Sequence, residues 1–416
     1  MKARDDLDPR RYSAARPPAL LLGGLNLTRA LGLAGIPVVV ASSDAHSAAF
    51  ASRYCAAALR LPRLEDHGTA VLECLLRAGE RLAGGLGRRV PLFYANDDWQ
   101  QLVQRHRAEL SRHYALLLND PEVAEAVIDK DLFQPLAVRR GLPIPRSLDR
   151  EALQGFGRPV LVKPRSKCAW DVSPVHVRLF GSQGKARIFK DGPSLLADPA
   201  AQELLDALLI QEYVDGGDRD LWSFHGFSDE SSRLLDWFIG RKIRTRPALT
   251  GSSSYLELAH DKDLAALGRE IAAALPMKGI FKIDLKRDRR LGCFRVLEVN
   301  ARYNLWHYLG AANGVNLPRT AYEYLVHGKR PAAAGRYRAT YRWIYLRQDW
   351  HAYRGLAARG ELGFGGWLWS LAAAPKVCQL FAWSDPLPFL GQLRHFVRSR
   401  LPRFGAVLRR WLSTAS

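Results

Sequence analysis

The spacing of hydrophobic positions divides the first part of the chain into alternating strands and helices. Uninterrupted apolar runs at 19–22, 38–40 and 92–94 have the length and composition of buried strands. A helical period over 27–33 lies between the first two runs, and together they give a βαβ pattern. Residues 19–118 are therefore predicted to form a Rossmann-like α/β domain.

The middle of the chain continues this alternation over a longer stretch. Helical periods are predicted over 119–139, 195–208, 261–275 and 317–325, and strand periods over 159–164, 221–244 and 279–299. Asn119 and Asp120 cap the first of these helices, and Gly141 follows its end. Residues 119–330 are predicted to form a second domain, so the fold class is α/β.

The two ends of the chain differ from its middle in composition. Residues 1–18 are polar, basic and contain proline, so we expect a flexible tail. Residues 331–416 form a basic extension that holds 13 Arg or Lys against 3 Asp or Glu, with six Trp. Apolar and arginine positions over 389–412 follow a helical pattern, which is typical of a helix lying on a membrane surface. The alternative, preferred from sequence alone, is an appendage that packs Trp and Leu on the protein and leaves Arg in solvent.

Length, cysteine content and charge limit the classes of protein. A chain of 416 residues is too long for one hydrophobic core, so two or three domains are expected. The five cysteines lack paired spacing, which argues against a disulfide framework or a zinc site and favours the cytoplasm. A net charge of +20 can attract phosphates, but short nucleic-acid-binding motifs are absent, so no nucleic-acid partner is expected.

Three oxygen donors stand out on two neighbouring predicted strands. Asp284 lies in an alternating run, and Glu298 and Asn300 are two residues apart, so they share one face of a strand. Carboxylate and amide oxygens suit Mg²⁺, with Mn²⁺ as a substitute. The alternative is a solvent-facing strand with ordinary charges.

Further polar residues precede these donors in a fixed order. They are two lysines, a glutamate with the two residues after it, and an aspartate: Lys130, Lys163, Glu212, Tyr213, Val214 and Asp220. This order, followed by an Asp and a Glu-x-Asn pair, resembles the ATP-grasp superfamily over roughly residues 120–330. The Arg241-Lys242 pair before Gly251-Ser-Ser resembles its carboxylate–amine ligase branch, which includes D-aspartate ligase and the large subunit of carbamoyl-phosphate synthase.

The resemblance implies a two-lobed ATP-grasp core of the α+β type and a role for each residue. By this resemblance, Lys130 and Lys163 would contact the α- and β-phosphates of ATP. Glu212 and the backbone of Tyr213 and Val214 would contact the adenine, and Asp220 or, as a weaker candidate, Asp218 would contact the ribose. Asp284, Glu298 and Asn300 would bind one or two Mg²⁺ ions. Arg302, Arg241 and Lys242 would contact the substrate or the acyl-phosphate. The alternative for the charged side chains Lys130, Glu212, Asp220, Arg241 and Lys242 is an ordinary solvated charge.

The activity implied is amide formation from a small carboxylate and an amine, driven by ATP through an acyl-phosphate. Two alternatives stay open: carbamoyl-phosphate-type or carboxylase-type chemistry, and a non-catalytic nucleotide-binding module. A homodimer and a peripheral membrane contact through the basic C-terminus also stay open. One departure from the family is the stretch after Lys163, where Arg165, Lys167 and Trp170 replace the usual glycine-rich loop.

Overall fold

The computed structural model describes residues 7–165, 174–181 and 186–397 of the chain. The chain forms two compact units. Unit 1 comprises the residues up to Leu102, His106–Leu116 and the residues from Cys378 onward, and unit 2 comprises Val103–Arg105 and Leu117–Val377. Within the described ranges, no helix combines the length and apolar character needed to cross a bilayer.

Unit 1 is built on a five-stranded parallel sheet in the order β3-β2-β1-β4-β5. Its strands are β1 (Ala19–Leu22), β2 (Val38–Ser42), β3 (Cys55–Arg60), β4 (Val90–Tyr94) and β5 (Tyr114–Ala115). Its helices are α1 (Leu25–Leu33), α2 (Gly68–Leu86), α3 (Asp97–Arg105, whose last residues group with unit 2) and α4 (Arg107–Leu110). All of β1 is buried, as a parallel strand covered on both faces requires. The Rossmann-like prediction is confirmed.

Residues 7–18 are part of unit 1, so the prediction of a flexible tail is wrong for them. Leu7 is buried, and Pro9–Arg11 form a 3₁₀ turn. Arg88 donates to the Ala14 carbonyl at 2.7 Å, and Arg16 donates to the Ala34 carbonyl at 3.0 Å. These long-range bonds leave no local pattern in the sequence. Residues 1–6 lie outside the described ranges.

A buried ion pair holds the C-terminal segment in unit 1. Arg29 on α1 is 1% exposed, and its Nε lies 3.0 Å from the carboxylate of Asp385, which is fully buried. Asp385 also accepts from the Ser52 hydroxyl and from the Arg53 N–H, each at 2.8 Å. The chain then continues as a helix over 387–397, and the part of the predicted 389–412 helix beyond this point lies outside the described residues.

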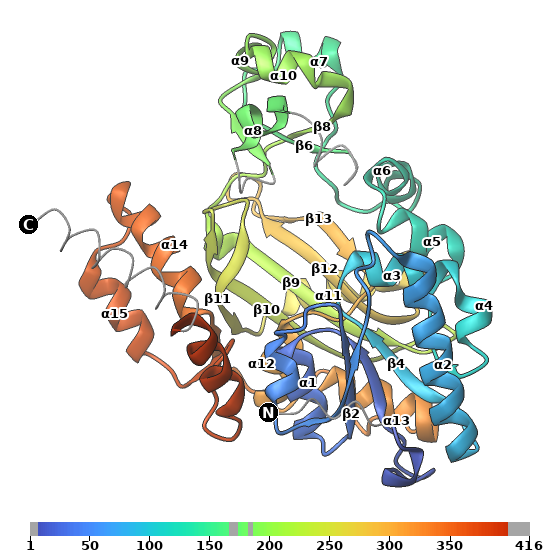
Figure 1. The fold of residues 1–416 in the computed structure, drawn as a ribbon. Helices are drawn as coiled ribbons and strands as arrows, with labels where there is room; N and C mark the ends of the chain where they lie inside the picture. The colour runs from blue at the N-terminus through green and yellow to red at the C-terminus, as the bar shows by residue number, and fades with distance from the viewer. Residues whose placement is uncertain (1–6, 166–173, 182–185, 398–416) are drawn as a thin grey trace, which may run out of the picture. The chain divides into compact units, whose positions relative to one another are not determined.

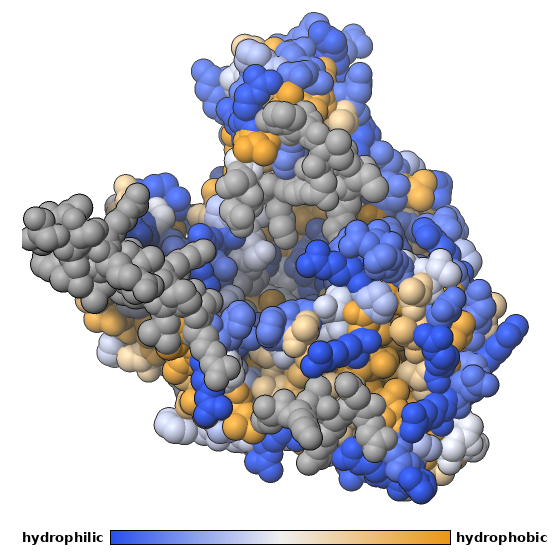
Figure 2. Space-filling view, in the orientation of Figure 1, coloured by the Kyte–Doolittle hydropathy of each residue, from blue (hydrophilic) through white to orange (hydrophobic). Residues whose placement is uncertain are grey.

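Unit 2 contains two lobes, of which the smaller carries a three-stranded antiparallel sheet in the order β7-β6-β8 (Figure 1). The strands are β6 (Val160–Pro164), β7 (Arg187–Phe189) and β8 (Leu208–Glu212), and the helices are α7 (Arg150–Gln154), α8 (Pro174–Phe180), α9 (Gly192–Leu196) and α10 (Pro199–Glu203). They enclose a small core around Leu153, Val162 and Leu195. On the side seen in Figure 2, the surface of this lobe is mostly hydrophilic.

The single helix predicted over 195–208 is wrong. Asp198 accepts from the Ala201 N–H at 3.0 Å and starts a new helix at Pro199. A 3₁₀ turn and the strand β8 follow, so the apolar residues at Leu208–Ile210 belong to a sheet.

The large lobe carries a seven-stranded sheet in the order β13-β12-β9-β10-β11-β14-β15. Its strands are β9 (Leu221–Ser228), β10 (Leu234–Arg246), β11 (Ser252–Leu258), β12 (Gly279–Arg287), β13 (Phe294–Asn300), β14 (Arg342–Ile344) and β15 (Lys376–Cys378). Its helices are α5 (Pro121–Ala126), α6 (Lys130–Arg139), α11 (Lys262–Ala274), α12 (Trp306–Ala312), α13 (Leu317–His327), α14 (Leu346–Ala358) and α15 (Phe364–Ala372). One face of the sheet packs its apolar side chains, such as Phe224, Ile239 and Ile283, in the main core with residues of α5, α6 and α11.

Residues 331–377 are built into unit 2, so the predicted boundary at 330 does not coincide with a boundary between the units. Strand β14 pairs with β11 and extends the sheet. Arg244 on β10 makes two hydrogen bonds of 2.8 Å to the buried carboxylate of Asp349 on α14. Trp367 and Ser254 donate to the same carboxylate at 2.9 and 3.1 Å. In this stretch Trp343 and Trp367 are buried in unit 2, whereas Trp369 is 74% exposed.

We expect Asp349→Ala to destabilise unit 2 by about 3–5 kcal/mol, because Arg244 would remain buried without a counter-charge. Urea unfolding monitored by tryptophan fluorescence would measure the loss. Glu361→Ala, which removes the partner of the half-exposed Arg359, is the matched control and should cost at most about 1 kcal/mol. Equal, small losses in both variants would contradict the structural role given to Asp349.

Candidate active site

The strand register of the large lobe brings polar residues together on the face opposite the main core, which we call the site face. Glu298 on β13, Asp284 on β12 and Ser223 on β9 are direct neighbours across the sheet. The next row contains Asn300, Lys282 and, on β9, His225. Because side chains alternate along a strand, both rows point away from the core.

Asp284 is held by two neighbours on the site face. Its carboxylate accepts from the Ser223 hydroxyl at 2.6 Å and lies 2.5 Å from the Lys282 ammonium. Burial would raise the pKa of Asp284, but Lys282 and Lys242 outweigh burial and hold that pKa below its ordinary value. The carboxylate is therefore charged at neutral pH.

The other two predicted metal ligands lie beside Asp284. Glu298 is exposed, whereas Asn300 is buried and accepts from Arg302 at 3.1 Å. The Asn300 amide nitrogen has no partner among the described residues. The described residues contain no cluster of three His, Cys, Asp or Glu side chains that could hold a metal. Two carboxylates and an amide fit Mg²⁺, which completes its coordination with phosphate and water.

Helix α12 closes the far end of the site face. The fully buried ring of His225 stacks on Phe238 at 4.4 Å and lies 5.2 Å from Trp306. Burial lowers the pKa of His225, and it lowers the pKa of the nearby His307 to about 4. Both rings are neutral at pH 7, so the charge next to Lys282 on this face is that of Asp284.

A cavity of about 240 Å³ lies between the small lobe and the open end of the site face. Asp284 and Glu298 line it together with four lysines, which are Lys130, Lys163, Lys242 and Lys286. Glu212, Tyr213 and Val214 line it from the small lobe. Four ammonium groups around one cavity create the positive potential that a polyphosphate requires.

The two predicted phosphate lysines come from different elements and meet at one end of β6. The predicted helix over 119–139 is in fact two helices, because Asp129 accepts from the Asp131 N–H at 2.8 Å and starts α6 at Lys130. Lys130 donates to the Pro164 carbonyl at 2.8 Å, next to Lys163. Burial lowers the pKa of Lys163 to about 8, with Glu298 opposing and Lys130 reinforcing the shift.

The segment after β8 is positioned by the rest of the small lobe. The Glu212 carboxylate accepts from the Arg146 N–H and from the Arg158 guanidinium, both at 3.2 Å. The Tyr213 N–H donates to Pro159 at 2.9 Å, whereas the N–H of the buried Val214 donates to no described residue. Because a buried N–H needs an acceptor, the Val214 position suits the edge of a purine ring.

Lys286 is a site residue that the sequence analysis missed. Its ammonium donates to the Tyr213 hydroxyl at 2.8 Å and lies 4.1 Å from the centre of that ring. Burial lowers the pKa of Lys286 to about 8, against the opposing charges of nearby aspartates, and raises the pKa of Tyr213 to about 12. The signal was present, because Lys282, Asp284 and Lys286 are each two residues apart on one strand.

The structure does not bring Arg241 to the cavity. Arg241 and Lys242 are consecutive on β10, so their side chains point to opposite faces of the sheet. Arg241 pairs with Glu257 and lies over the ring of Trp222, a residue of the main core. Lys242 lines the cavity, and burial lowers its pKa although Asp284 opposes this.

Neither ribose candidate lines the cavity. Asp220 accepts from the Gly217 N–H and pairs with Arg289, both at 2.7 Å. Asp218 accepts three bonds of 2.7–2.8 Å from Thr245 and Leu249, which fixes the loop after β10. Their roles toward a nucleotide stay predictions.

The stretch after Lys163 is described only at its start. Arg165 pairs with Asp131 on α6 at 2.6 Å. Lys167 and Trp170, the other residues expected to replace a glycine-rich loop, lie outside the described residues.

Comparison with known structures identifies the fold of this chain. A biotin carboxylase–ATP complex from Campylobacter jejuni superimposes with a TM-score of 0.56 at 13% identity, covering 76% of this chain and 72% of that one. An L-amino acid ligase from Bacillus licheniformis gives a TM-score of 0.50 at 14% identity, with coverages of 75% and 74%. The chain has the ATP-grasp fold.

Sequence comparison gives a more particular likeness. The chain is 21% identical over 281 residues to a D-aspartate ligase of Enterococcus faecium (strain Aus0004). The match covers 64% of this chain and spans 65% of the length of that relative. No family model matches the chain.

The pKa of Lys163 predicts a pH dependence for nucleotide binding. Above pH 8 this lysine loses its proton, which should lower ADP affinity by up to about tenfold per pH unit between 8.5 and 9.5, in addition to the loss that Lys286 causes. Without ligand, the lowered pKa of Lys163 makes the free energy of unfolding rise between about pH 8 and 10.5. In this range Lys163 has lost its proton in the folded protein but keeps it in the unfolded chain. Calorimetric titration with ADP would measure the affinity.

Lys163→Arg is the control for this prediction, because arginine stays charged while Lys286 still titrates in both proteins. The affinity of the variant for ADP should fall less steeply with pH, because ADP binding to the variant depends on about one titrating proton fewer. Identical slopes for wild type and variant would contradict a phosphate role for Lys163.

The Lys282–Asp284 contact predicts competition between this ammonium and a metal ion. Lys282→Met should lower the Mg²⁺ concentration needed for ADP binding by about three- to tenfold, because Mg²⁺ would no longer displace a charge 2.5 Å from Asp284. Thermal stabilisation by ADP at stepped Mg²⁺ concentrations is the readout. Lys278→Met, which removes a lysine paired with Asp120 outside the cavity, is the control. An unchanged or higher Mg²⁺ requirement in Lys282→Met would argue against the competition.

Proposed function

We propose that this chain is an ATP- and Mg²⁺-dependent ligase that joins a carboxylate to an amine through an acyl-phosphate. The observation that carries the proposal is the cavity in which four lysines surround Asp284 and Glu298. Positive charge for the phosphates and oxygen donors for a cation occur there together, as phosphoryl transfer requires. The likeness to a D-aspartate ligase supports the same reaction class.

In this proposal the chain's residues hold ATP from both lobes. Lys130 and Lys163 bind the α- and β-phosphates, and the backbone from Glu212 to Val214 meets the adenine. Asp284, Glu298 and Asn300 would hold one or two Mg²⁺ ions. Bound Mg²⁺ supplies charge neutralisation and alignment of the phosphates. Lys286, fixed by Tyr213, adds a positive charge that lines the same cavity.

The reaction follows in two steps. An oxygen of the substrate carboxylate attacks the γ-phosphorus, the bond to the bridging oxygen breaks, and ADP leaves an acyl-phosphate behind. The amine then attacks the acyl carbon, the carbon–oxygen bond breaks, and inorganic phosphate and one proton are released. We propose that Lys242 and Arg302 stabilise the charge that develops on the acyl-phosphate and substrate carboxylate.

A second candidate is carboxylase-type chemistry, in which bicarbonate replaces the organic acid. The similarity to a biotin carboxylase shows the fold alone at 13% identity, so it does not favour this reaction over the other. The name of the sequence relative makes D-aspartate the first substrate to test.

Phosphate release from ATP and Mg²⁺ tests the proposal. We expect release with D-aspartate or another small carboxylate only when an amine from a pooled panel is present. Glu298→Gln should slow this release about 100-fold or more, because it removes a charge placed to hold the metal beside the phosphates. Glu270→Gln, on the exposed side of α11, is the matched control and should keep the wild-type rate.

Two outcomes would redirect the assignment. Release that depends on bicarbonate and not on any organic acid would select the carboxylase-type reaction. ADP binding without phosphate release for any tested pair of acid and amine would contradict the ligase proposal and favour a nucleotide-binding module.

A further inference from the structure

Leu249, in the loop between β10 and β11, has a backbone conformation that leucine rarely adopts. Its φ is 71°, and Ser232 is the other residue besides glycines that has a positive φ in the described part of the chain. In this left-handed region the Cβ of an L-residue crowds its own backbone, so a free loop would favour glycine there. The fold therefore holds Leu249 in a strained state, and strain of this kind is concentrated at functional sites.

The side chain of Asp218 holds Leu249 in this conformation. Its carboxylate accepts from the Leu249 N–H at 2.7 Å, and from the N–H and the hydroxyl of Thr245 at 2.7 and 2.8 Å. The Gly251 N–H donates to the Pro247 carbonyl at 2.9 Å and closes the loop. Hydrogen bonds to a carboxylate are about twice as strong as those between neutral groups, so the three bonds to Asp218 offset part of the strain.

The residues chosen at two positions of this loop separate packing from function. A Cβ at Gly251 would lie 2.0 Å from the backbone of Arg246, so packing requires glycine there. At position 249 the backbone also favours glycine, yet the sequence has leucine. Leu249 is 36% exposed, so contacts within the protein recover only part of the cost of its conformation. A ligand that covers Leu249 would supply the rest.

Leu249 lies in the wall of the cavity of about 240 Å³ that the proposed function assigns to ATP. The same cavity is lined by Leu161, Leu221 and Leu297, besides its four lysines. Ammonium groups suit phosphates, whereas leucine side chains suit the carbon framework of a nucleoside. Because a leucine side chain cannot hydrogen-bond a phosphate, the chemistry of Leu249 matches the nucleoside part of the ligand.

We propose that Leu249 binds the nucleoside part of ATP and that Asp218 is the positioning residue for this contact. The bound nucleoside covers the leucine side chain, and the apolar contact offsets the strain of the free loop. Asp218 acts on the nucleotide only through the loop, without a hydrogen bond to the ribose. This inference rests on the nucleotide site of the proposed function, but it does not depend on the identity of the acid or the amine.

Calorimetric titration of the full chain with ADP and with tripolyphosphate, both in the presence of Mg²⁺, tests the contact. Leu249→Gly and Leu249→Ala should each weaken ADP binding about three- to tenfold, because both remove the side chain. Neither should change the affinity for tripolyphosphate, which has no nucleoside and whose binding shows that the variants are folded. Without ligand, Leu249→Gly should have a Tm about 2–4 °C above that of Leu249→Ala, since only glycine relieves the strained φ.

A double-mutant cycle tests the role of Asp218. Asp218→Asn should weaken ADP binding by a similar factor in the wild-type protein, but it should have little further effect in Leu249→Gly, because it acts through the same leucine. Asp215→Asn is the matched control. Asp215 and Asp218 both oppose the lowering of the Lys286 pKa, but the Asp215 carboxylate makes no hydrogen bond to the described loop 247–251. This control should bind ADP within about twofold of wild type.

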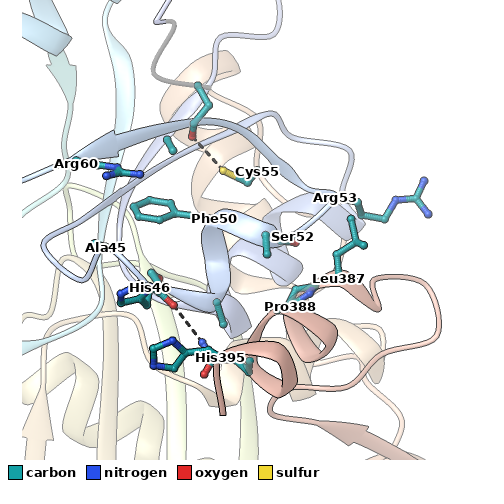
Figure 3. A pocket seen from close by; sticks show the side chains of 17 residues that line it. Ala45, His46, Phe50, Ser52, Arg53, Cys55, Arg60, Leu387, Pro388 and His395 are labelled. Atoms are coloured by element: carbon teal, nitrogen blue, oxygen red, sulfur yellow. Dashed lines mark hydrogen bonds between the residues drawn. The ribbon is translucent and has the colours of Figure 1, made fainter. Parts of the chain in front are cut away.

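A larger cavity in unit 1 is the other place where the phosphates of a nucleotide could bind. It measures about 440 Å³, and its described lining residues include Arg53, Arg60, His46 and His395 but no Asp or Glu (Figure 3). Arg60→Gln removes one of these charges and should leave the affinities for ADP and tripolyphosphate unchanged. A loss of ADP affinity in Arg60→Gln, with none in Leu249→Gly, would overturn the inference and place the nucleotide in unit 1.

Other outcomes bear on the contact and on the ligase separately. Wild-type ADP affinity in both Leu249 variants would overturn the contact and leave the ligase proposal intact. Equal losses for ADP and tripolyphosphate would also overturn the contact, because the loop would then act on the phosphates. Full additivity of Asp218→Asn and Leu249→Gly would overturn the positioning role of Asp218. ADP binding that depends on Leu249, without phosphate release for any pair of acid and amine, would support the contact and contradict the ligase alone.

Discussion

The antiparallel register of β13, β12, β9 and β10 decides where the charges of the candidate site lie. Because side chains alternate, one set of positions builds the core and the next set builds the site. Asp284 is next to Glu298 and Ser223 only as long as this register holds. A shift of one residue would turn Ile283 toward the cavity and Asp284 into the core, so the stability of the sheet and the charges of the candidate site depend on the same pairing.

The site balances its charges internally through short-range pairs. Lys282 neutralises Asp284, Arg158 neutralises Glu212, and Tyr213 accepts from Lys286. Burial lowers the pKa of both Lys163 and Lys286 to about 8, because the nearby carboxylates offset only part of the cost of desolvation. Each of these pairs can be exchanged for a contact with nucleotide or metal at small electrostatic cost, because the ligand brings charges of the kind already present. Binding in such a site is an exchange of partners more than the burial of new charge.

Local patterns in the sequence predicted the strands that carry the candidate site, which are β9, β10, β12 and β13, but not β3, β7, β11 or β14. The period of two placed Glu298 and Asn300 on one face of a strand, and in the structure Glu298 is the cross-strand neighbour of Asp284 and Asn300 that of Lys282. The same rule would have separated Arg241 from Lys242 and added Lys286, had it been applied to every polar position. The break before α6 depended on a single capping residue, Asp129, inside a pattern that otherwise continues. Division of the C-terminal stretch between two units had no local signal, because it rests on pairs far apart in the sequence, such as Arg244–Asp349 and Arg29–Asp385.

Those distant pairs have a consequence for the order in which the protein folds during its synthesis. Asp385 is made 356 residues after Arg29, when all residues of unit 2 have already been synthesised. Until Asp385 has been synthesised, unit 1 lacks the carboxylate that pairs with Arg29, a side chain that is buried in the folded protein. The N-terminal domain, which would ordinarily fold first, can reach its final state only after unit 2 has been synthesised. The sheet of unit 1 can form early, but the segment from Cys378 onward that completes unit 1 is synthesised only after the whole of unit 2.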